Sequence, residues 1–539
     1  MHIIHDGTSS DLAYVTIIAE NDDLIRMLDY VLIANRINQK RWLAQVVERA
    51  RNLPAMGGDP LDPTILHGLE LAQSYSDIRS IESRYLYRTL LLGEITDKET
   101  IQTATVGPRP AASVTTVAQA DLFKYLNVPQ FNDDAQKSNV IGLITNVSNA
   151  PLCFTADLFN THVGVAGAIG CGKSNIGANL VKQGVNLNRC VLVHDVKPDY
   201  TRMREANSDG RVKDLWPLFA PCGLRPSGLS DVYSIGFYGA CDPRAVDRII
   251  SLNASDFLPT SLAYLIFRRD EENQAEEFAT AAEQIRQQRG ERAIYSVADI
   301  VAYVDKNPDG KIHEKTRAAI LSKVRRRDRV PVWLDKIGQT VNVPNSPKQI
   351  RVEHFDLETI ARAGRVIHIA YDPGISHNDY AIIVGYFLRV AHRYCVQGNF
   401  KGGVSGLIQF IDEAHRIFDN TSSQAGSLIN QFNRVMREGR SKEHSIVLLI
   451  QNIDQIPDGV FNNLSSLIVM RQNSLAMAKK ATQNFGGDAY AAQALQLGTG
   501  QALVKLFESR AVLFAQMAPS PFELERPDNR RRTKPLSEL

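Results

Sequence analysis

The chain has 539 residues, of which 44% are hydrophobic and 22% are charged, and these proportions exclude a disordered or collagen-like protein. Lysine and arginine number 61 and aspartate and glutamate 59, so the net charge of +2 excludes a global attraction to nucleic acid or to an anionic membrane. A chain of this length is expected to form roughly three domains.

The sequence contains no signal for a membrane or for export. Apolar runs such as Ser445–Ile450 are far shorter than the roughly 20 residues that a membrane-spanning helix needs. Residues 1–6 combine neither a basic segment nor an apolar one, so no export signal is expected. The six cysteines form no CxxC pair and no cluster with histidine. Reduced thiols and a cytoplasmic location are therefore predicted.

Residues 1–155 are predicted to form a small β-rich domain. Short β-like runs at Tyr14–Ile18 and Val140–Thr145 are separated by turn-rich segments such as Val106–Pro110. A different pattern begins at His162, where a strand, a glycine-rich loop and a helix follow one another.

The rest of the chain is predicted to be an α/β domain with a parallel sheet. Its strand-like runs are apolar without polar alternation, as strands covered on both faces require, and helix-like segments separate most of them. These runs lie at Cys190–His194, Val366–Ala370, Leu407–Ile411 and Ser445–Ile450.

The α/β domain is predicted to comprise residues 156–242 and 348–516, with a helical insertion at 243–347 between them. Within the insertion, Asp270–Arg292 and Ile312–Arg329 combine helical spacing with heavy charge, which is typical of solvated helix faces. Residues 517–539 are predicted to form an extended tail.

A phosphate-binding loop is the clearest motif. Residues 167–174 read GAIGCGKS, which fits the pattern GxxxxGK[ST], and they directly follow the apolar strand His162–Ala166. In such a loop the backbone N–H groups face phosphate oxygens, the lysine reaches the β and γ phosphates, and the hydroxyl binds Mg²⁺. A glycine turn with a surface lysine is the alternative. The residues expected to bind nucleotide are Gly167, Gly170, Cys171, Gly172, Lys173, Ser174 and Asn175.

Two acidic residues follow the apolar strand Leu407–Ile411. Asp412 is expected to hold Mg²⁺, directly or through water, together with Ser174. Glu413 is expected to be the general base that polarises the attacking water. Acidic pairs at a strand end also cap the next helix, so this assignment depends on the phosphate loop.

Two further positions are expected to contact the γ-phosphate. Gln451 follows the strand Ser445–Ile450 and is predicted to sense that phosphate, with a plain turn residue as the alternative. Arg440, at an arginine-rich helix end, is predicted to act in trans on a neighbouring subunit, with Arg437 as the second choice. The alternative is that these arginines only complement the helix C-terminus.

Together these motifs resemble the HerA branch of the FtsK–HerA superfamily of DNA-translocating ATPases. The resemblance covers Asn160 to about Phe514 and, more faintly, the N-terminal domain, which looks like the family's β-barrel. It implies a RecA-like ATPase core that uses ATP and Mg²⁺, a homo-hexameric ring with nucleotide between neighbours, and double-stranded DNA in a central channel. It also implies a separate nuclease or effector, in DNA end processing or antiphage defence. The matching stretches are His162–Asn175, Val191–Tyr200, Phe410–His415, Arg437–Arg440 and Gln451.

The chain departs from the family in two places. Val196–Asp199 stands where relatives carry a P-x-G-E turn, and Thr161 stands where several relatives carry an arginine.

Contacts with DNA are predicted at a few basic residues, since six copies around a channel converge on the same phosphates. The first candidates are Lys197, Arg202 and Arg204. Residues 323–327 (KVRRR) are a second group, which a solvated helix face explains equally well. Arg530–Arg532 in the tail are predicted either to bind DNA or to brace a neighbouring subunit. No base-reading motif is present, so binding should be independent of sequence.

The function predicted is that of a hexameric ATPase that moves along double-stranded DNA and feeds or activates a partner nuclease. A rival from another class is a nucleotide-gated scaffold that assembles and controls an effector without moving DNA. A third candidate, a conjugation-type ATPase that pumps DNA at a membrane, is disfavoured by the missing membrane segment.

Overall fold

The computed structural model divides the chain into two compact units. Unit 1 contains Met1–Thr155, Pro221–Gly223 and Ser466–Ala518, and unit 2 contains Ala156–Ala220, Leu224–Ser465 and Pro519–Leu539. Most of the segment that follows Ser465 was predicted as α/β core, and it packs with the N-terminal residues. The structure describes residues 2–4, 14–19, 25–35, 39–50, 85–108, 112–129, 139–147, 150–290, 293–306, 308, 310, 312–326, 329–372, 374–398, 400–418, 425–486 and 488–525.

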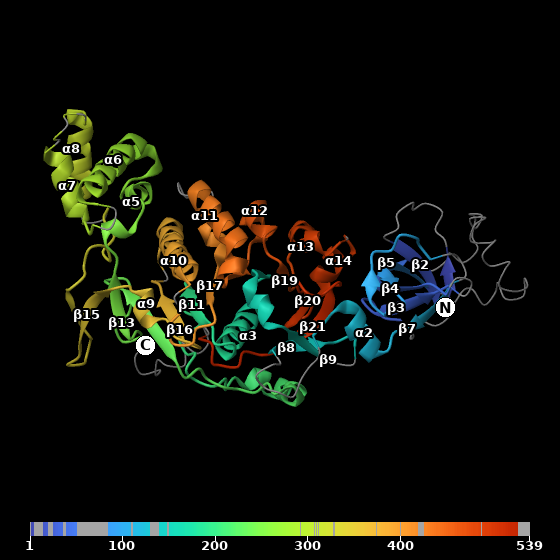
Figure 1. The fold of residues 1–539 in the computed structure, drawn as a ribbon. Helices are drawn as coiled ribbons and strands as arrows, with labels where there is room; N and C mark the ends of the chain where they lie inside the picture. The colour runs from blue at the N-terminus through green and yellow to red at the C-terminus, as the bar shows by residue number, and fades with distance from the viewer. Residues whose placement is uncertain are drawn as a thin grey trace, which may run out of the picture. The chain divides into compact units, whose positions relative to one another are not determined.

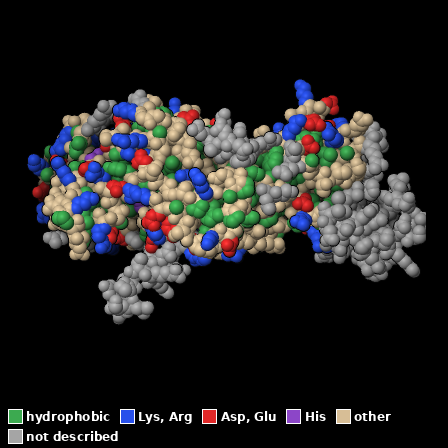
Figure 2. Space-filling model, turned by 90° about the horizontal axis from the view of Figure 1, so that it is seen from below, with side chains coloured by type: hydrophobic (Ala, Val, Ile, Leu, Met, Phe, Trp, Pro, Cys, Tyr) green, Lys and Arg blue, Asp and Glu red, His purple; other side chains and the backbone are tan. Residues whose placement is uncertain are grey.

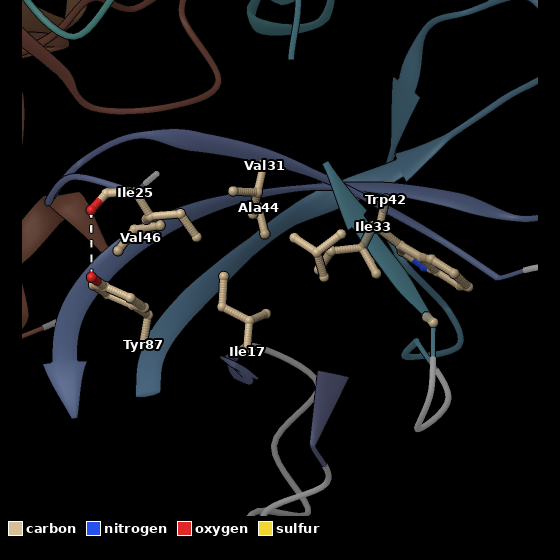
Figure 3. Packing of buried hydrophobic residues seen from close by; sticks show 10 residues of the cluster. Ile17, Ile25, Val31, Ile33, Trp42, Ala44, Val46 and Tyr87 are labelled. Atoms are coloured by element: carbon tan, nitrogen blue, oxygen red, sulfur yellow. Dashed lines mark hydrogen bonds between the residues drawn. The ribbon is translucent and has the colours of Figure 1, made fainter. Parts of the chain in front are cut away.

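Unit 1 contains an antiparallel sheet that closes on itself (Figure 1). Its strand order is β2-β1-β7-β3-β4-β5-β6, and β2 also pairs with β5, which closes a small barrel. Figure 3 shows its interior, where Ile17, Ile33 and Trp42 are fully buried. The predicted β-barrel is therefore confirmed. The strands are β1 (His2–Ile4), β2 (Tyr14–Ala19), β3 (Tyr30–Ala34), β4 (Arg41–Ala50), β5 (Tyr85–Ile95), β6 (Ile101–Gln102) and β7 (Ser113–Thr116).

A second antiparallel set of strands in unit 1 pairs in the order β19-β20-β21-β8-β9. The barrel is joined to it at Val512, whose carbonyl accepts hydrogen bonds from the Tyr30 hydroxyl at 2.8 Å and from the Gln45 amide at 2.9 Å. The strands are β8 (Asn139–Ile144), β9 (Ala150–Phe154), β19 (Ser466–Val469), β20 (Gln501–Lys505) and β21 (Leu513–Met517), and the helices are α2 (Gln119–Leu126), α13 (Leu475–Thr482) and α14 (Ala489–Gln496).

Unit 2 is built on a parallel sheet in the order β15-β13-β12-β16-β11-β17-β18-β10, with the antiparallel strand β14 at the β15 edge. Its central strands are buried along their whole length, which explains why their sequences are mostly apolar. The α/β class and the four strands predicted after the phosphate loop are confirmed. The strands are β10 (Val163–Ala166), β11 (Cys190–Asp195), β12 (Val232–Phe237), β13 (Arg248–Ser251), β14 (Thr340–Asn342), β15 (Gln349–His354), β16 (Val366–Ala370), β17 (Leu407–Ile411) and β18 (His444–Ile450).

Helices cover both faces of this sheet (Figure 1). α3 packs on one face, where a Cβ on Gly177 would meet the Phe410 ring at 2.6 Å. α10 packs on the other, where the Phe387 and His194 rings lie 5.3 Å apart. The helices are α3 (Lys173–Asn186), α4 (Trp216–Phe219), α5 (Pro259–Ile266), α6 (Glu272–Arg289), α7 (Val297–Lys306), α8 (Glu314–Val324), α9 (Leu357–Ile360), α10 (His377–Gln397), α11 (Ala425–Glu438) and α12 (Asp458–Phe461).

The predicted helical insertion contains α5 to α8, which gather beyond one end of the sheet in Figure 1. It also contains the strands β13 and β14, which the sequence pattern did not indicate because they have four and three residues. Within the described residues, every helix falls short of the length and apolar character that crossing a membrane requires.

Candidate functional site

The loop between β10 and α3 has the backbone of a phosphate cradle. Gly170 and Gly172 adopt φ angles of 75° and 112°, in the left-handed region that favours glycine. The Gly167 N–H donates to the Ile450 carbonyl at 3.1 Å, which ties the loop to the end of β18. The loop therefore opens at the carboxyl end of the parallel sheet, beside the N-terminus of a 14-residue helix.

Lys173 lies within this loop. Its ammonium donates to the Gly167 and Ala168 carbonyls at 2.7 and 2.9 Å. Burial lowers the pKa of Lys173, because water solvates its charge poorly there. A phosphate oxygen at the cradle would offer this ammonium a charged acceptor in place of two carbonyls.

Cys171 and Asn175 hold the loop in place. The Cys171 side chain is fully buried, and its thiol donates to the Ala168 carbonyl at 2.9 Å. The Asn175 amide oxygen accepts the Ser520 N–H at 3.3 Å. Both side chains thus support the cradle, and the Asn175 N–H donates to the Gly172 carbonyl at 3.0 Å.

Asp195, at the end of β11, shapes the turn beside the loop. Its carboxylate accepts the N–H groups of Asp199 and Tyr200, both at 2.9 Å, and lies 2.9 Å from His368 Nε2. This turn is the place where the sequence departs from the P-x-G-E pattern. It brings Asp199 to the Ser174 hydroxyl, which donates to the Asp199 carboxylate at 3.0 Å.

Asp199 is a site residue that the sequence analysis missed. Burial and the nearby Asp195 raise its pKa to about 6, and the Ser174 hydrogen bond partly offsets that rise. The available signal was an acidic residue in the turn after β11, but nothing in the spacing showed that it would meet Ser174.

Asp412 and Ser174 offer oxygen ligands to a cation. Asp412 is 3% exposed, and its Oδ2 atom has no hydrogen-bond partner among the residues that the structure describes. Burial and the adjacent Glu413 raise its pKa well above the ordinary value. The Tyr380 hydroxyl donates to the Asp412 carbonyl at 2.7 Å and fixes the backbone. A buried carboxylate oxygen without a partner, close to other carboxylates, fits a hard cation such as Mg²⁺.

Glu413 and Gln451 are linked by Lys197. Glu413 adopts a φ of 49°, which turns its side chain away from the strand direction at the start of the short helix Ala414–Ile417. Its carboxylate pairs with the Lys197 ammonium, which also donates to the Gln451 side-chain oxygen at 3.2 Å. His415 Nε2 lies 3.4 Å from the second Glu413 oxygen. The predicted base and the predicted sensor therefore share one lysine.

The predicted trans arginines lie at the end of α11. Arg440 is exposed in the 3-10 turn Gly439–Lys442 and, among the described residues, has no ion-pair partner. Arg437 is exposed and donates to the Asn433 carbonyl at 3.1 Å, within its own helix. Gly439 is required at the start of the turn, since a Cβ there would meet the His444 carbonyl oxygen at 2.5 Å.

The basic residues predicted to contact DNA are engaged within unit 2. Lys197 belongs to the site above. Arg202 pairs with Glu205 and lies 3.7 Å from Glu523, and Arg204 pairs with Asp247 at 2.6 Å. Figure 2 shows basic and acidic side chains interspersed on the face that it presents.

The other residues predicted to contact DNA, 323–327 and Arg530–Arg532, are only partly described by the structure. Lys323 pairs with Glu271 at 2.9 Å, while Arg325 and Arg326 are exposed. Arg327 and Arg530–Arg532 lie outside the described residues. Contact with DNA stays a prediction for every one of these residues.

Two family profiles match the sequence. The profile described as "Helicase HerA, central domain" matches residues 139–460, and the profile described as "Helicase HerA-like C-terminal" matches residues 404–520. The first covers more than half of the 539 residues. A comparison with curated proteins gives no match.

Solved structures of two proteins are similar to this chain at low sequence identity. VirB4 of Thermoanaerobacter pseudethanolicus has a TM-score of 0.49 at 12% identity, over 73% of this chain and 99% of that chain. The plasmid coupling protein TrwB in complex with ADP and Mg²⁺ has a TM-score of 0.48 at 13% identity, over 74% and 92%. The assignment rests on the two profiles, which contain the phosphate loop and both acidic residues and confirm the resemblance seen in the motifs. The chain belongs to the family of the helicase HerA, which is built on a P-loop NTPase core.

Proposed function

We propose that this protein is an ATP-driven, Mg²⁺-dependent DNA translocase or helicase of the HerA type. It works as a homo-hexamer on double-stranded DNA, beside a separate nuclease or effector, in DNA end processing or antiphage defence. The observation that carries the catalytic part is the convergence of Lys173, Ser174, Asp412 and Glu413 at the carboxyl ends of β10 and β17, with β18 between them.

The reaction is the hydrolysis of ATP to ADP and phosphate. Lys173 and the loop N–H groups hold the β and γ phosphates, while Ser174 and Asp412 hold the metal. Mg²⁺, when bound, neutralises charge on the phosphate oxygens. Glu413 orients a water and accepts its proton as the water oxygen bonds to the γ-phosphorus. The bond from that phosphorus to the β–γ bridging oxygen breaks, and ADP leaves with this oxygen.

A hexameric ring would complete the site. Arg440 is exposed and has no ion-pair partner among the described residues, so its charge is available to a neighbouring subunit. An arginine supplied in trans stabilises the charge that spreads over the γ-phosphate oxygens in the transition state. Gln451 is close enough to share Lys197 with Glu413 and serves as the sensor of that phosphate.

A nucleotide-gated scaffold is the second candidate function. Arg202 and Arg204, which were predicted to contact DNA, are held in ion pairs with Glu205 and Asp247. Phosphate contacts from these side chains would require the pairs to open. A ring that assembles and controls an effector would need the same nucleotide site and no DNA contact.

The test is ATP hydrolysis by the full chain with and without long duplex DNA, with Glu413→Gln as the control for contaminating activity. A several-fold increase with DNA, absent in the variant, supports the translocase. Turnover that ignores DNA and responds to a partner protein supports the scaffold. Wild-type protein that hydrolyses no ATP at all contradicts both.

A further inference from the structure

Lys197 joins the two residues that were assigned separately to water activation and to γ-phosphate sensing. The turn that carries it is fixed by Asp195, which accepts the N–H groups of Asp199 and Tyr200. Its ammonium contacts the Glu413 carboxylate and the Gln451 side-chain oxygen. The Lys197 side chain is 46% exposed and that of Glu413 is 6% exposed. The lysine therefore closes the open side of a buried carboxylate.

This contact hinders general base catalysis by Glu413. The lysine ammonium occupies one oxygen of the carboxylate and covers its open side, so a water at the γ-phosphate has little access to that oxygen. We therefore expect the pair to open before hydrolysis. Opening it without a substitute would leave a buried charge unpaired, which is strongly unfavourable.

The γ-phosphate of ATP can replace the Glu413 carboxylate as the anionic partner of the Lys197 ammonium. It is a multiply charged anion, and a lysine ammonium binds such an anion as a point charge without demanding a fixed geometry. Gln451 gives the ammonium a second acceptor that does not depend on Glu413. His415, 3.4 Å from Glu413, offers that carboxylate a partner after the lysine has left. ADP lacks the γ-phosphate and offers no such exchange.

We propose that Lys197 is a positioning residue that blocks Glu413 in the absence of a γ-phosphate and releases it by moving its ammonium to that phosphate. This proposal rests on the ATPase function proposed above. It gives Lys197 a role in the nucleotide site in place of contact with DNA. It predicts that the site distinguishes ATP from ADP through the competition between Glu413 and the γ-phosphate for one ammonium.

The test is a double-mutant cycle on nucleotide affinity. The dissociation constants of AMPPNP and ADP are measured by titration calorimetry in MgCl₂ for the full-length wild type, Glu413→Gln, Lys197→Met and the double variant. Direct repulsion between Glu413 and the γ-phosphate acts with or without the lysine, so the cycle subtracts it. We expect Glu413→Gln to tighten AMPPNP binding about ten-fold more when Lys197 is present than when it is replaced. The same cycle on ADP is expected to give no coupling.

Lys348→Met is the matched control, because Lys348 is exposed in the turn before β15. It should leave both affinities at the wild-type values. If Lys197→Met does not fold, Lys197→Gln replaces it, with thermal unfolding as the check. If Glu413→Gln tightens AMPPNP binding equally with Lys197 present and with Lys197 replaced, the proposed lysine exchange is wrong. That result would not contradict the proposed ATPase function. Wild-type protein that binds neither nucleotide overturns the proposed function itself.

Discussion

The Ser174 hydroxyl donates a hydrogen bond to the Asp199 carboxylate at 3.0 Å, although the two residues belong to different turns of the sheet edge. Ser174 is the second residue of α3, the helix after the phosphate loop, and Asp199 follows β11. A carboxylate that orients a metal-binding hydroxyl acts on the metal through that hydroxyl.

Replacement of Asp199 should therefore change the dependence on Mg²⁺ more than the dependence on ATP. We expect Asp199→Asn to raise the Mg²⁺ concentration for half-maximal ATP hydrolysis about ten-fold, because outer ligands tune metal affinity by such factors. The measurement is a Mg²⁺ titration at saturating ATP. Asp242→Asn, at an exposed carboxylate paired with Arg244, serves as control. An unchanged titration for Asp199→Asn would contradict the role given to this hydrogen bond.

Removal of the general base should separate binding from hydrolysis. Glu413→Gln keeps the shape of the side chain and cannot take a proton from water, so we expect kcat to fall by at least about 100-fold. ATP should still bind, since Lys173 and the loop are untouched. Phosphate release and nucleotide binding measured on the same preparation check this. A variant that hydrolyses ATP at the wild-type rate would remove Glu413 from its role.

Arg440 can be tested by mixing two inactive proteins. We expect Arg440→Ala to lower kcat about 1,000-fold, as the loss of a trans arginine does in other P-loop enzymes. In a mixed ring with Glu413→Gln subunits, some interfaces combine an intact Glu413 with an intact Arg440. Activity should therefore reappear on mixing, and ATP hydrolysis against mixing ratio measures it. Arg437→Ala is the matched comparison one turn earlier. Mixtures that stay inactive would place Arg440 outside the neighbour's site.

The stability of the protein should fall in mild acid. His162 Nε2 lies 2.8 Å from the Met436 carbonyl and its Nδ1 accepts the Ile446 N–H at 3.1 Å, an arrangement that needs the neutral ring. Burial lowers the pKa of His162 from 6.5 to about 4. Between these values the unfolded chain binds a proton that the folded protein excludes, so the free energy of unfolding decreases as pH falls from 6.5 toward 4.

The loss due to His162 should reach about 3 kcal/mol near the lower value. Denaturant unfolding at a series of pH values measures it. His162→Gln, whose amide can donate and accept without titrating, should have a shallower pH dependence than wild type. The control variant His313→Asn, at an exposed N-cap, should have the same pH dependence of stability as wild type. A pH profile that is identical in wild type and His162→Gln would show that this ring does not carry the effect.

The central sheet was predictable because its strands are buried on both faces. β11, β17 and β18 are buried at every position, so their sequences are mostly apolar and lack polar alternation. β15 was missed because it is exposed on one side: Ile350 and Val352 are buried, while their neighbours Arg351 and Glu353 face solvent. Such alternation over six residues is short, and it lies in a polar stretch.

The candidate site was predictable where its residues are contiguous in the sequence. It was not predictable where residues far apart in the sequence meet only in the folded structure. The phosphate loop and the Asp412–Glu413 pair are contiguous motifs. Lys197 and Glu413 are 216 positions apart, and Ser174 and Asp199 meet only because Asp195 bends the turn after β11. Basic residues near one another in sequence suggested DNA contact, but sequence does not show which of them are already paired with carboxylates.

The position of β18 bears on how neighbouring nucleotide sites would communicate. This strand of seven residues is about 23 Å long and lies between the phosphate-loop strand and the acidic strand. The turn with Arg440 leads into one end of it, and Gln451 leaves the other. In a closed ring, one end would report on the neighbour's nucleotide and the other on the subunit's own. In the proposed ring, one hydrogen-bonded strand would then connect two nucleotide sites, so a displacement at one end would be passed to the other.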